Sequence, residues 1–293
     1  MSFILSTDSC CDAYKSDLAK KNIYYIPMAY IMDNVEYQDT FDSDQEYKTF
    51  YDHIREGKMS KTTQLNVVET AEFFEDLLNK NQGDLIHFSL SSGLSTTAEN
   101  AKSAAKEVME KFKNRNIYVI DSKGATMGQM LLVDTACELR ESGKSAKETA
   151  DYMNGLVERL QHFVMVKNLF HLKRGGRVSS ASAIVGSLLG IRPIITVNHK
   201  GELVVIGKER GKAKAIDRLV NSFREFKADN ATRVYIAHAD DLEVAEELKE
   251  KLKDAGATDI RISFIGPVIG SHTGTGTVSI MFEGKKRMVV EKK

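Results

Sequence analysis

The chain has 293 residues, with 41 Lys and Arg against 41 Asp and Glu, and 42% of its residues are hydrophobic. This apolar fraction and the balanced charge exclude a disordered chain. A formal net charge of zero also argues against a protein that binds nucleic acid over its whole surface. At about 150 residues per domain, the length predicts two domains or one large one.

No apolar run approaches the roughly 20 residues that a membrane-spanning helix needs, so we expect no stable membrane insertion. The first residues lack the basic and apolar regions of an export signal. The three cysteines are Cys10, Cys11 and Cys137, and they form no CxxC pair. We therefore expect a cytoplasmic protein without disulfides, metal or cofactor.

The first half of the chain alternates between strand-like and helical patterns. Apolar runs predict strands at 3–5, 24–31, 84–90 and 117–120, and helical spacing predicts helices at 44–57, 68–78, 96–112, 126–141 and 146–160. Strands that alternate with helices are typical of a parallel sheet covered by helices. We predict an α/β N-terminal domain over residues 1–160.

The second half has a different pattern. Strands are predicted at 163–166, 194–197, 203–206, 233–237, 259–264 and 277–282, and helices at 213–226 and 242–255. The strands at 194–197 and 203–206 are joined by a short turn and predict a hairpin. We therefore predict an α+β C-terminal domain with antiparallel pairing over residues 161–293.

Residues 91–99 are the first candidate site, because they follow a predicted buried strand and open a predicted helix. Residues 91–97 carry five hydroxyl side chains, and Thr96 and Glu99 have the spacing of a capping box. Unpaired N–H groups at a helix start attract carboxylates and phosphates. The alternative is an ordinary capped helix with hydroxyls in solvent.

Other polar segments follow strands or join helices. Residues 59–64 form a predicted polar loop with Thr62 and Thr63, while 6–9 and 121–124 follow predicted strands. The carboxyl ends of parallel strands meet at one edge of a sheet, so these separate loops are expected to converge there. Asp8 and Asp121 could instead serve only as helix caps.

Two glycine-rich segments carry cationic or titratable side chains. Residues 173–177 place Arg174 and Arg177 around two glycines, which suits a carboxylate or phosphate, although a basic surface turn is the alternative. Residues 266–276 form a predicted loop in which glycines and hydroxyls surround His272. Metal-binding, nucleophile-elbow and kinase signatures are all missing from the sequence.

Six short segments together resemble the DegV family over essentially the whole chain. They are STDS at 6–9, KTTQ at 61–64, SSGLS at 91–95, IDS at 120–122, RGGRV at 174–178 and GSHTG at 270–274. The resemblance implies a two-domain protein that binds a long-chain fatty acid between its domains. It also implies that the carboxylate is presented to a partner fatty acid kinase, which forms the acyl phosphate.

The family motifs fall on five residues of this chain as carboxylate contacts: Thr62, Thr63, Ser95, Arg177 and His272. The choice between Thr62 and Thr63, and between Arg174 and Arg177, stays open. For the acyl tail we expect an apolar slot lined by Ile184, Val185, Leu188, Leu189 and Ile191. We expect a fatty-acid-binding protein that is not an enzyme; the rival is a hydrolase or transferase with Ser95 as nucleophile and His272 as base.

Overall fold

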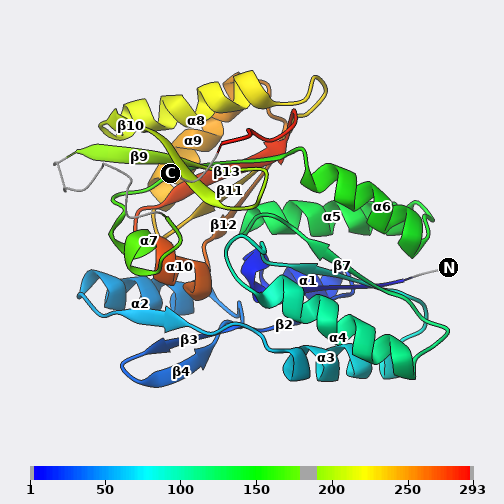
Figure 1. Cartoon of the computed structure of the whole chain (residues 1–293). Coiled ribbons are helices and arrows are strands. Elements are labelled where there is room, and N and C mark those ends of the chain that lie inside the picture. Colours follow the sequence, from blue (N-terminus) through cyan, green and yellow to red (C-terminus); the bar gives the residue numbers. More distant parts are fainter. Residues whose placement is uncertain (1–2, 179–189, 291–293) are drawn as a thin grey trace.

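The computed structural model describes residues 3–178 and 190–290. Three sheets and their surrounding helices confirm the predicted α/β class (Figure 1). The strands are β1 Ile4–Asp8, β2 Ile23–Ile26, β3 Ala29–Met32, β4 Val35–Gln38, β5 Ser60–Thr62, β6 Leu85–Ser89, β7 Ile117–Asp121, β8 Leu160–Met165, β9 Ile191–Val197, β10 Leu203–Arg210, β11 Arg233–His238, β12 Asp259–Phe264 and β13 Val278–Glu283.

The helices begin and end close to the predicted residues wherever the apolar spacing is long. They are η1 Ser9–Cys11, α1 Lys15–Lys20, α2 Asp44–Arg55, α3 Val67–Lys80, α4 Thr97–Lys111, α5 Met127–Glu141, α6 Ala146–Val157, α7 Phe170–Arg174, α8 Lys212–Phe226, α9 Leu242–Asp254 and α10 Pro267–Thr273. In the described ranges, no helix combines the length and the apolar character that crossing a bilayer requires.

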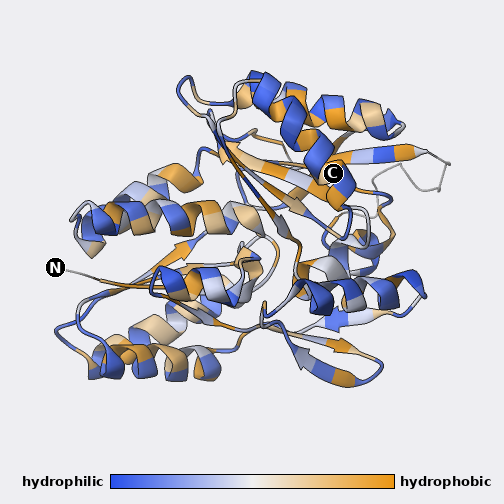
Figure 2. Ribbon diagram, turned by 180° about the vertical axis from the view of Figure 1, so that it is seen from behind, coloured by the Kyte–Doolittle hydropathy of each residue, from blue (hydrophilic) through white to orange (hydrophobic). Residues whose placement is uncertain are grey.

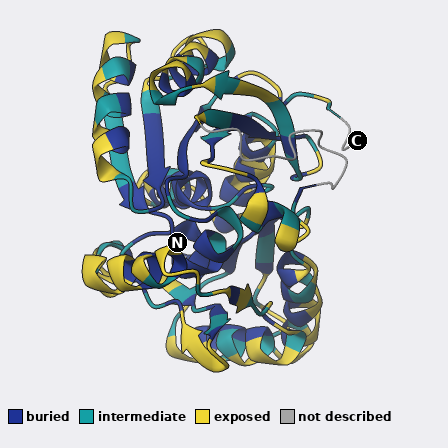
Figure 3. Ribbon diagram, turned by 90° about the vertical axis from the view of Figure 1, so that its left-hand side faces the viewer, coloured by how far each residue is buried: buried dark blue, intermediate teal, exposed yellow. Residues whose placement is uncertain are grey.

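The N-terminal part contains a four-stranded parallel sheet in the order β2-β1-β6-β7, as the alternating pattern predicts. Helices α3 and α4 cover one face, and α5 and α6 cover the other. The strands are apolar and buried between these layers, while the outer helix faces are exposed (Figures 2 and 3). Because the strands are parallel, the loops after β1, β6 and β7 all leave the same edge of the sheet.

The C-terminal part contains a six-stranded mixed sheet in the order β10-β9-β8-β13-β11-β12. Strands β9 and β10 form the predicted antiparallel hairpin, with a bulge between Val205 and Gly207. Strands β11 and β12 are parallel and are connected through α9. Helices α8 and α9 pack against the sheet, and their apolar faces and the strands form one buried cluster around Phe163, Phe223 and Phe282.

The prediction of one strand at 24–31 was wrong. Pro27 separates β2, which joins the parallel sheet, from β3, which pairs with β4 and β5 in a small antiparallel sheet. The predicted polar loop at 59–64 is likewise partly a strand, because β5 pairs Ser60 and Thr62 with β3. A three-residue polar strand lacks the alternating apolar pattern that would reveal it.

Helix α5 lies between the two large sheets (Figure 1). It contacts β1 and β6 of the parallel sheet and β8, β11 and β13 of the mixed sheet. Ten of its residues between Met127 and Cys137 are buried, as expected for a helix that is covered on all sides. The continuous buried cluster that includes α5 makes the two sheets share one core.

A buried ion pair cluster ties α5 to both halves of the chain. Asp134 on α5 is 2% exposed. Its carboxylate accepts bonds from the Nζ of Lys21 at 2.5 Å, from the hydroxyl of Tyr235 at 2.6 Å and from Arg261. Two cations and a hydroxyl thus satisfy one desolvated carboxylate, which is the condition under which a buried charge is tolerated.

Candidate functional site

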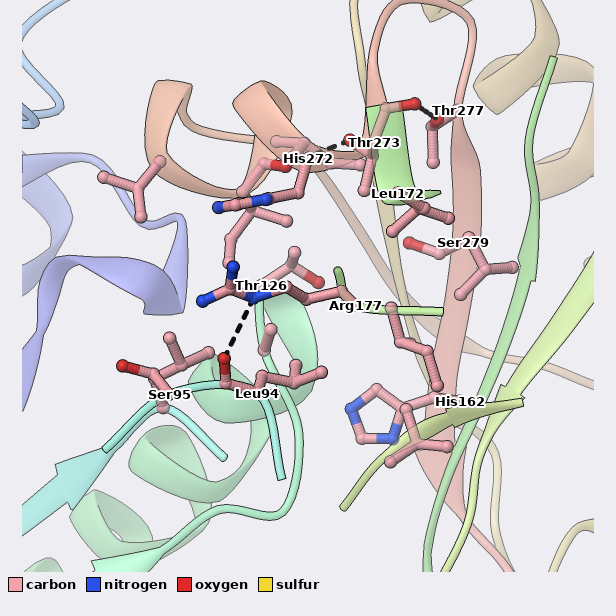
Figure 4. A pocket seen from close by; sticks show the side chains of 18 of the residues that line it. Leu94, Ser95, Thr126, His162, Leu172, Arg177, His272, Thr273, Thr277 and Ser279 are labelled. Carbon is pink, nitrogen blue, oxygen red and sulfur yellow. Dashed lines mark hydrogen bonds between the residues drawn. The ribbon is translucent and has the colours of Figure 1, made fainter. Parts of the chain in front are cut away.

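A cavity of about 450 Å³ lies between the loop edge of the parallel sheet and the inner face of the mixed sheet (Figure 4). Loops 90–95 and 124–126 line one side, and strands β8, β9 and β13 line the other. Its wall is mainly apolar and includes Val164, Val166, Leu172, Ile195, Val197, Leu203 and Met281. The volume is in the range of small-molecule sites in proteins.

The five residues expected to contact a carboxylate all line this cavity: Thr62, Thr63, Ser95, Arg177 and His272. They come from five separate places: the end of β5, the residue after it, the loop before α4, the turn after α7, and α10. Figure 4 shows Arg177 between the helix that carries His272 and the loop that carries Ser95. The fold therefore gathers hydroxyl, guanidinium and imidazole groups at one part of an apolar chamber.

His272 is bonded to Thr62, with its Nε2 2.9 Å from the Thr62 hydroxyl oxygen. The Nδ1 of His272 is buried without a partner among the described residues. We assign the proton to Nε2, because an unpaired acceptor costs less than an unpaired N–H donor. His272 then donates to the Thr62 oxygen, and the Thr62 hydroxyl hydrogen stays available for a ligand.

The imidazole of His272 is neutral at physiological pH. Burial, followed by the nearby charges of Arg177 and Arg174, lowers its pKa to about 4. A Cβ built on Gly175 would lie 2.2 Å from His272 Nδ1. The glycine of the Arg-Gly-Gly-Arg segment thus allows α7 to approach α10 closely, a contact that any larger residue would block.

This pKa predicts an effect of pH on stability. His272 binds a proton less readily in the folded than in the unfolded chain, so its contribution to stability falls as pH drops from about 6.5 to about 4. The contribution of His272 to the free energy of unfolding falls by about 1.4 kcal/mol per pH unit, which amounts to about 3 kcal/mol over the whole interval. In urea titrations, His272→Gln should lose less stability than the wild type over this interval. Parallel curves for the two proteins would contradict the assignment.

The start of α4 differs from the predicted capping box. Thr96 occupies the N-cap position but makes no capping bond, and its hydroxyl bonds to Gln64 instead. Ser95 instead bonds to the start of the helix: its Oγ accepts from the Thr97 N–H at 3.2 Å and lies 2.8 Å from the Thr97 hydroxyl. Ser95 therefore sits at the positive end of a 15-residue helix, in a hydroxyl pair with Thr97 in which either oxygen can donate.

The two arginines have different surroundings. Arg174 donates to the carbonyl oxygens of Ser60 at 2.8 Å and Ser271 at 3.2 Å, and it does not line the cavity. Arg177 lines the cavity and donates through Nε to the Leu94 carbonyl at 3.1 Å. The geometry therefore favours Arg177 as the guanidinium nearest to a ligand and Arg174 as a brace between β5 and α10.

Both glycine-rich segments singled out in the sequence contain or adjoin short helices. Residues 170–174 form α7, and 267–273 form α10, so the glycine-rich segment around His272 is helical through most of its length. The prediction of a glycine-rich loop at 266–276 was wrong because Pro267 follows Gly266 at the first helical position, where proline favours a helix start.

Asp8 and Asp121 organise the loops without lining the cavity. Asp8 caps η1 by accepting from the Cys10 N–H and also accepts from Leu90 N–H at 2.7 Å. Asp121 accepts from the N–H groups of Ser92 at 3.1 Å and Lys123 at 3.0 Å. The two aspartates therefore fix the loops after three neighbouring strands relative to one another, which is a structural role.

Of the residues expected to line the tail slot, Ile184, Val185, Leu188 and Leu189 lie outside the described residues, and Ile191 begins β9 without lining the cavity. The described wall comes from alternate residues, namely His162 and Val164 of β8 and Val166 just after it, and from β9 and β13. Their period of two is visible in the sequence, but which face of the strand borders a cavity depends on the neighbouring layer.

Thr126, which sequence reasoning also missed, lines the cavity in a strained conformation. Its backbone has φ 56° and ψ −144°, in a region that a β-branched residue rarely adopts. Its N–H donates to the Cys10 carbonyl at 2.6 Å. Such strain is often concentrated at functional sites, and here it sets the entry of α5 beside the chamber.

The Ser95–His272 pair that an enzyme with Ser95 as nucleophile requires is not formed among the described residues. The Nε2 of His272 contacts Thr62, and no hydrogen bond joins Ser95 to His272. Nor do the residues at 3–178 and 190–290 place three or more His, Cys, Asp or Glu side chains where they could hold a metal ion. Donors for an anionic head group beside an apolar chamber are therefore the main chemical feature of the site.

The fold and this chamber define an α/β protein with a mixed C-terminal sheet and one apolar site that ends in polar, positively charged groups. A family model described as "Uncharacterised protein, DegV family" matches residues 2–285. A DegV domain-containing protein of Clostridium perfringens is 38% identical over 284 residues, which cover 96% of this chain and 97% of the relative. The chain belongs to the DegV family.

Solved structures of family members are similar over nearly the whole chain. A DegV lipid-binding protein of Thermotoga maritima has a TM-score of 0.87 and 30% identity, and the match covers 98% of this chain and 100% of that one. DegV of Bacillus subtilis, a fatty-acid-binding protein, has a TM-score of 0.82 and 28% identity, with 97% and 100% covered. These relatives bind lipid or fatty acid.

Proposed function

We propose that this protein binds a long-chain fatty acid in the chamber described above. The observation that carries the proposal is the placement of Thr62, Ser95, Arg177 and His272 at one part of an otherwise apolar cavity. A buried carboxylate needs several donors, or it takes up a proton. Hydroxyl hydrogens, the α4 N-terminus and a guanidinium charge meet that need, and the fatty-acid-binding relatives support the same ligand.

The tail would lie against the apolar wall of the chamber. The chamber lies between residues 1–160 and residues 161–293, which we propose as two domains. Residues from both parts line the chamber. Each buried methylene contributes about 0.8 kcal/mol, so a sixteen-carbon tail supplies on the order of 10 kcal/mol before ordering costs. Most of the affinity would therefore come from the tail, while the polar groups fix the direction in which the chain enters.

We further propose that the protein acts without catalysis of its own and presents the carboxylate to a partner fatty acid kinase. Thr62 and Ser95 would hold the carboxylate, and the partner would supply ATP and transfer the phosphoryl group to a carboxylate oxygen. The hydroxyls of Thr62 and Ser95, together with the guanidinium of Arg177, would position the acid and offset its negative charge before and after the phosphoryl transfer.

Lipid extraction of the purified protein followed by mass spectrometry tests the binding proposal. We expect one fatty acid per chain, because a chamber of this kind retains its ligand through purification. Recovery of no acyl chain, together with no binding of added fatty acid, would contradict it. Adding a bacterial fatty acid kinase and ATP should then give acyl phosphate only when the loaded protein is present. Turnover of acyl esters that is lost in Ser95→Ala would instead favour an enzyme.

A further inference from the structure

A second cavity, of about 370 Å³, is lined by residues of α2 and of the β3–β4 hairpin. Figure 1 shows where these elements lie in the fold. The second cavity shares no lining residue with the first, although Pro267 at the start of α10 borders it. Its lining combines aromatic rings with carboxylates. Within the described part of the chain, no Lys or Arg lines it. The chemistry of this cavity is therefore opposite to that of the fatty-acid chamber.

Aromatic rings form its walls. The ring of Tyr30 stacks on Tyr37 with centroids 5.2 Å apart and meets Phe50 edge-on at 5.2 Å. Tyr37 is 45% exposed and stands at the mouth, whereas Phe50 is buried. Aromatic faces carry negative partial charge and attract cations, most strongly where water is excluded. Tyr30, Tyr37 and Phe50 thus form one cluster of contacting rings on the wall of this cavity.

Unpaired carboxyl groups lie at the floor. Asp39 lines the cavity, is 1% exposed and has an Oδ1 without a partner, while its Oδ2 accepts from the Val268 N–H at 3.3 Å. Asp12 lies beside it: a Cβ built on Gly266 would be 2.8 Å from Asp12 Oδ1 and 3.0 Å from Asp39 Oδ2. The Asp12 carboxyl group faces the Gly266 N–H and has no side-chain partner among the described residues.

A further polar group is unsatisfied in the same place. The Tyr47 hydroxyl has no partner, although the residue is 2% exposed and lines the cavity. Burial, together with the nearby carboxyl groups of Asp39 and Asp12, raises the pKa of Tyr47. Burial raises the pKa of Asp39 to about 8, so this carboxyl group is mostly protonated near pH 7 before a cation binds, and a bound cation would favour its ionised form. Buried polar groups without partners are costly, so a ligand that engages them would recover this free energy.

We propose that this cavity binds an organic ammonium ion, with Asp39 as its counter-ion and the rings of Tyr30, Tyr37 and Phe50 around its charged head. An anion would meet the carboxyl groups of Asp39 and Glu46, with His53 as the one basic side chain among the lining residues. A metal ion would lack ligands, because the described residues offer no group of three candidate ligands. A soft, weakly hydrated cation fits both the rings and the carboxylate.

Choline and 3,3-dimethyl-1-butanol test the proposal, because they have nearly the same shape and differ in charge. In calorimetry or ligand-observed NMR with the full chain, choline should bind saturably and the neutral alcohol at least about tenfold more weakly. Equal binding of both compounds, or no binding of choline, would overturn the proposal. Co-sedimentation with phosphatidylcholine vesicles is measured in parallel. Co-sedimentation of the protein would identify a lipid head group as the source of the ammonium ion, whereas binding of choline alone would identify a free ligand.

Tyr37→Ala and Tyr152→Ala are matched variants, since both remove an exposed tyrosine, at 45% and 46% exposure. Tyr37→Ala should weaken choline binding about fivefold or more, whereas Tyr152→Ala, on α6, should bind as the wild type does. Asp39→Asn should abolish binding; if that variant does not fold, the Tyr37 pair decides. Wild-type affinity in Tyr37→Ala would overturn the assignment. Fatty-acid content, measured on the same samples, reports separately on the first chamber.

Discussion

Thr62→Val is expected to weaken fatty-acid binding by about ten- to a hundredfold. The substitution keeps the side-chain shape but removes the hydroxyl that we propose donates to the carboxylate, and a hydrogen bond to a charged group is worth about 1.5–3 kcal/mol. It also leaves the Nε2 of His272 without its partner 2.9 Å away. Displacement of a fluorescent fatty acid, or calorimetry on delipidated protein, measures the change.

Thr63→Val is the matched control, because it makes the same chemical change one residue further along. The Thr63 hydroxyl donates to the Ala29 carbonyl at 3.5 Å, whereas the Thr62 hydroxyl bonds to His272. Its loss should change affinity by less than about threefold, within the range of a weak neutral hydrogen bond. A larger loss in Thr63→Val than in Thr62→Val would move the carboxylate contact to Thr63. Unchanged binding in both would place the head group elsewhere in the chamber.

Asp134→Ala is expected to lower the free energy of unfolding by about 3–5 kcal/mol, the usual cost of breaking a buried ion pair. The carboxylate is buried and bonds Lys21, Tyr235 and Arg261, so its removal leaves two cations and a hydroxyl uncompensated. The loss is a large share of the 5–15 kcal/mol that typically stabilises a folded protein. Chemical denaturation followed by circular dichroism gives the free energy.

Asp151→Ala is the control for this change. Asp151 pairs with Lys147 at 2.7 Å, but its side chain is 65% exposed, and exposed pairs contribute little. Its substitution should alter stability by less than about 1 kcal/mol. Similar losses of stability in Asp134→Ala and Asp151→Ala would show that burial of the Asp134 carboxylate does not increase its contribution to stability. A small loss of stability in Asp134→Ala would mean that water hydrates the side chains of Lys21, Tyr235 and Arg261 when the carboxylate is absent.

The ligand chamber and the ammonium cavity flank the same short helix. Val268 and His272 of α10 line the first cavity, and Pro267 lines the second. Asp39, which we propose as counter-ion, also accepts from the Val268 N–H at the start of that helix. The first turn of α10 thus lies between the proposed carboxylate site and the proposed cation site.

Long, regular patterns were predicted well because local spacing decides them. Helices α2, α3, α8 and α9 and the β9–β10 hairpin lie where their apolar periods and turns place them. Short or polar elements were missed. Strand β5 has three residues, and α7 and α10 interrupt segments rich in glycine and basic residues. Such segments carry too few apolar positions for a period, so contacts with neighbouring elements decide their conformation.

The amino-acid sequence determined the fold class, the family and five of the polar residues that line the chamber, since these follow from apolar periodicity and short motifs. Only the tertiary structure decided that Thr62 meets His272, that Arg174 braces the backbone while Arg177 borders the cavity, and that β8 supplies the apolar wall. The reason is physical: these contacts join residues up to 210 positions apart. Their distances depend on how two sheets pack around α5, which no local pattern specifies.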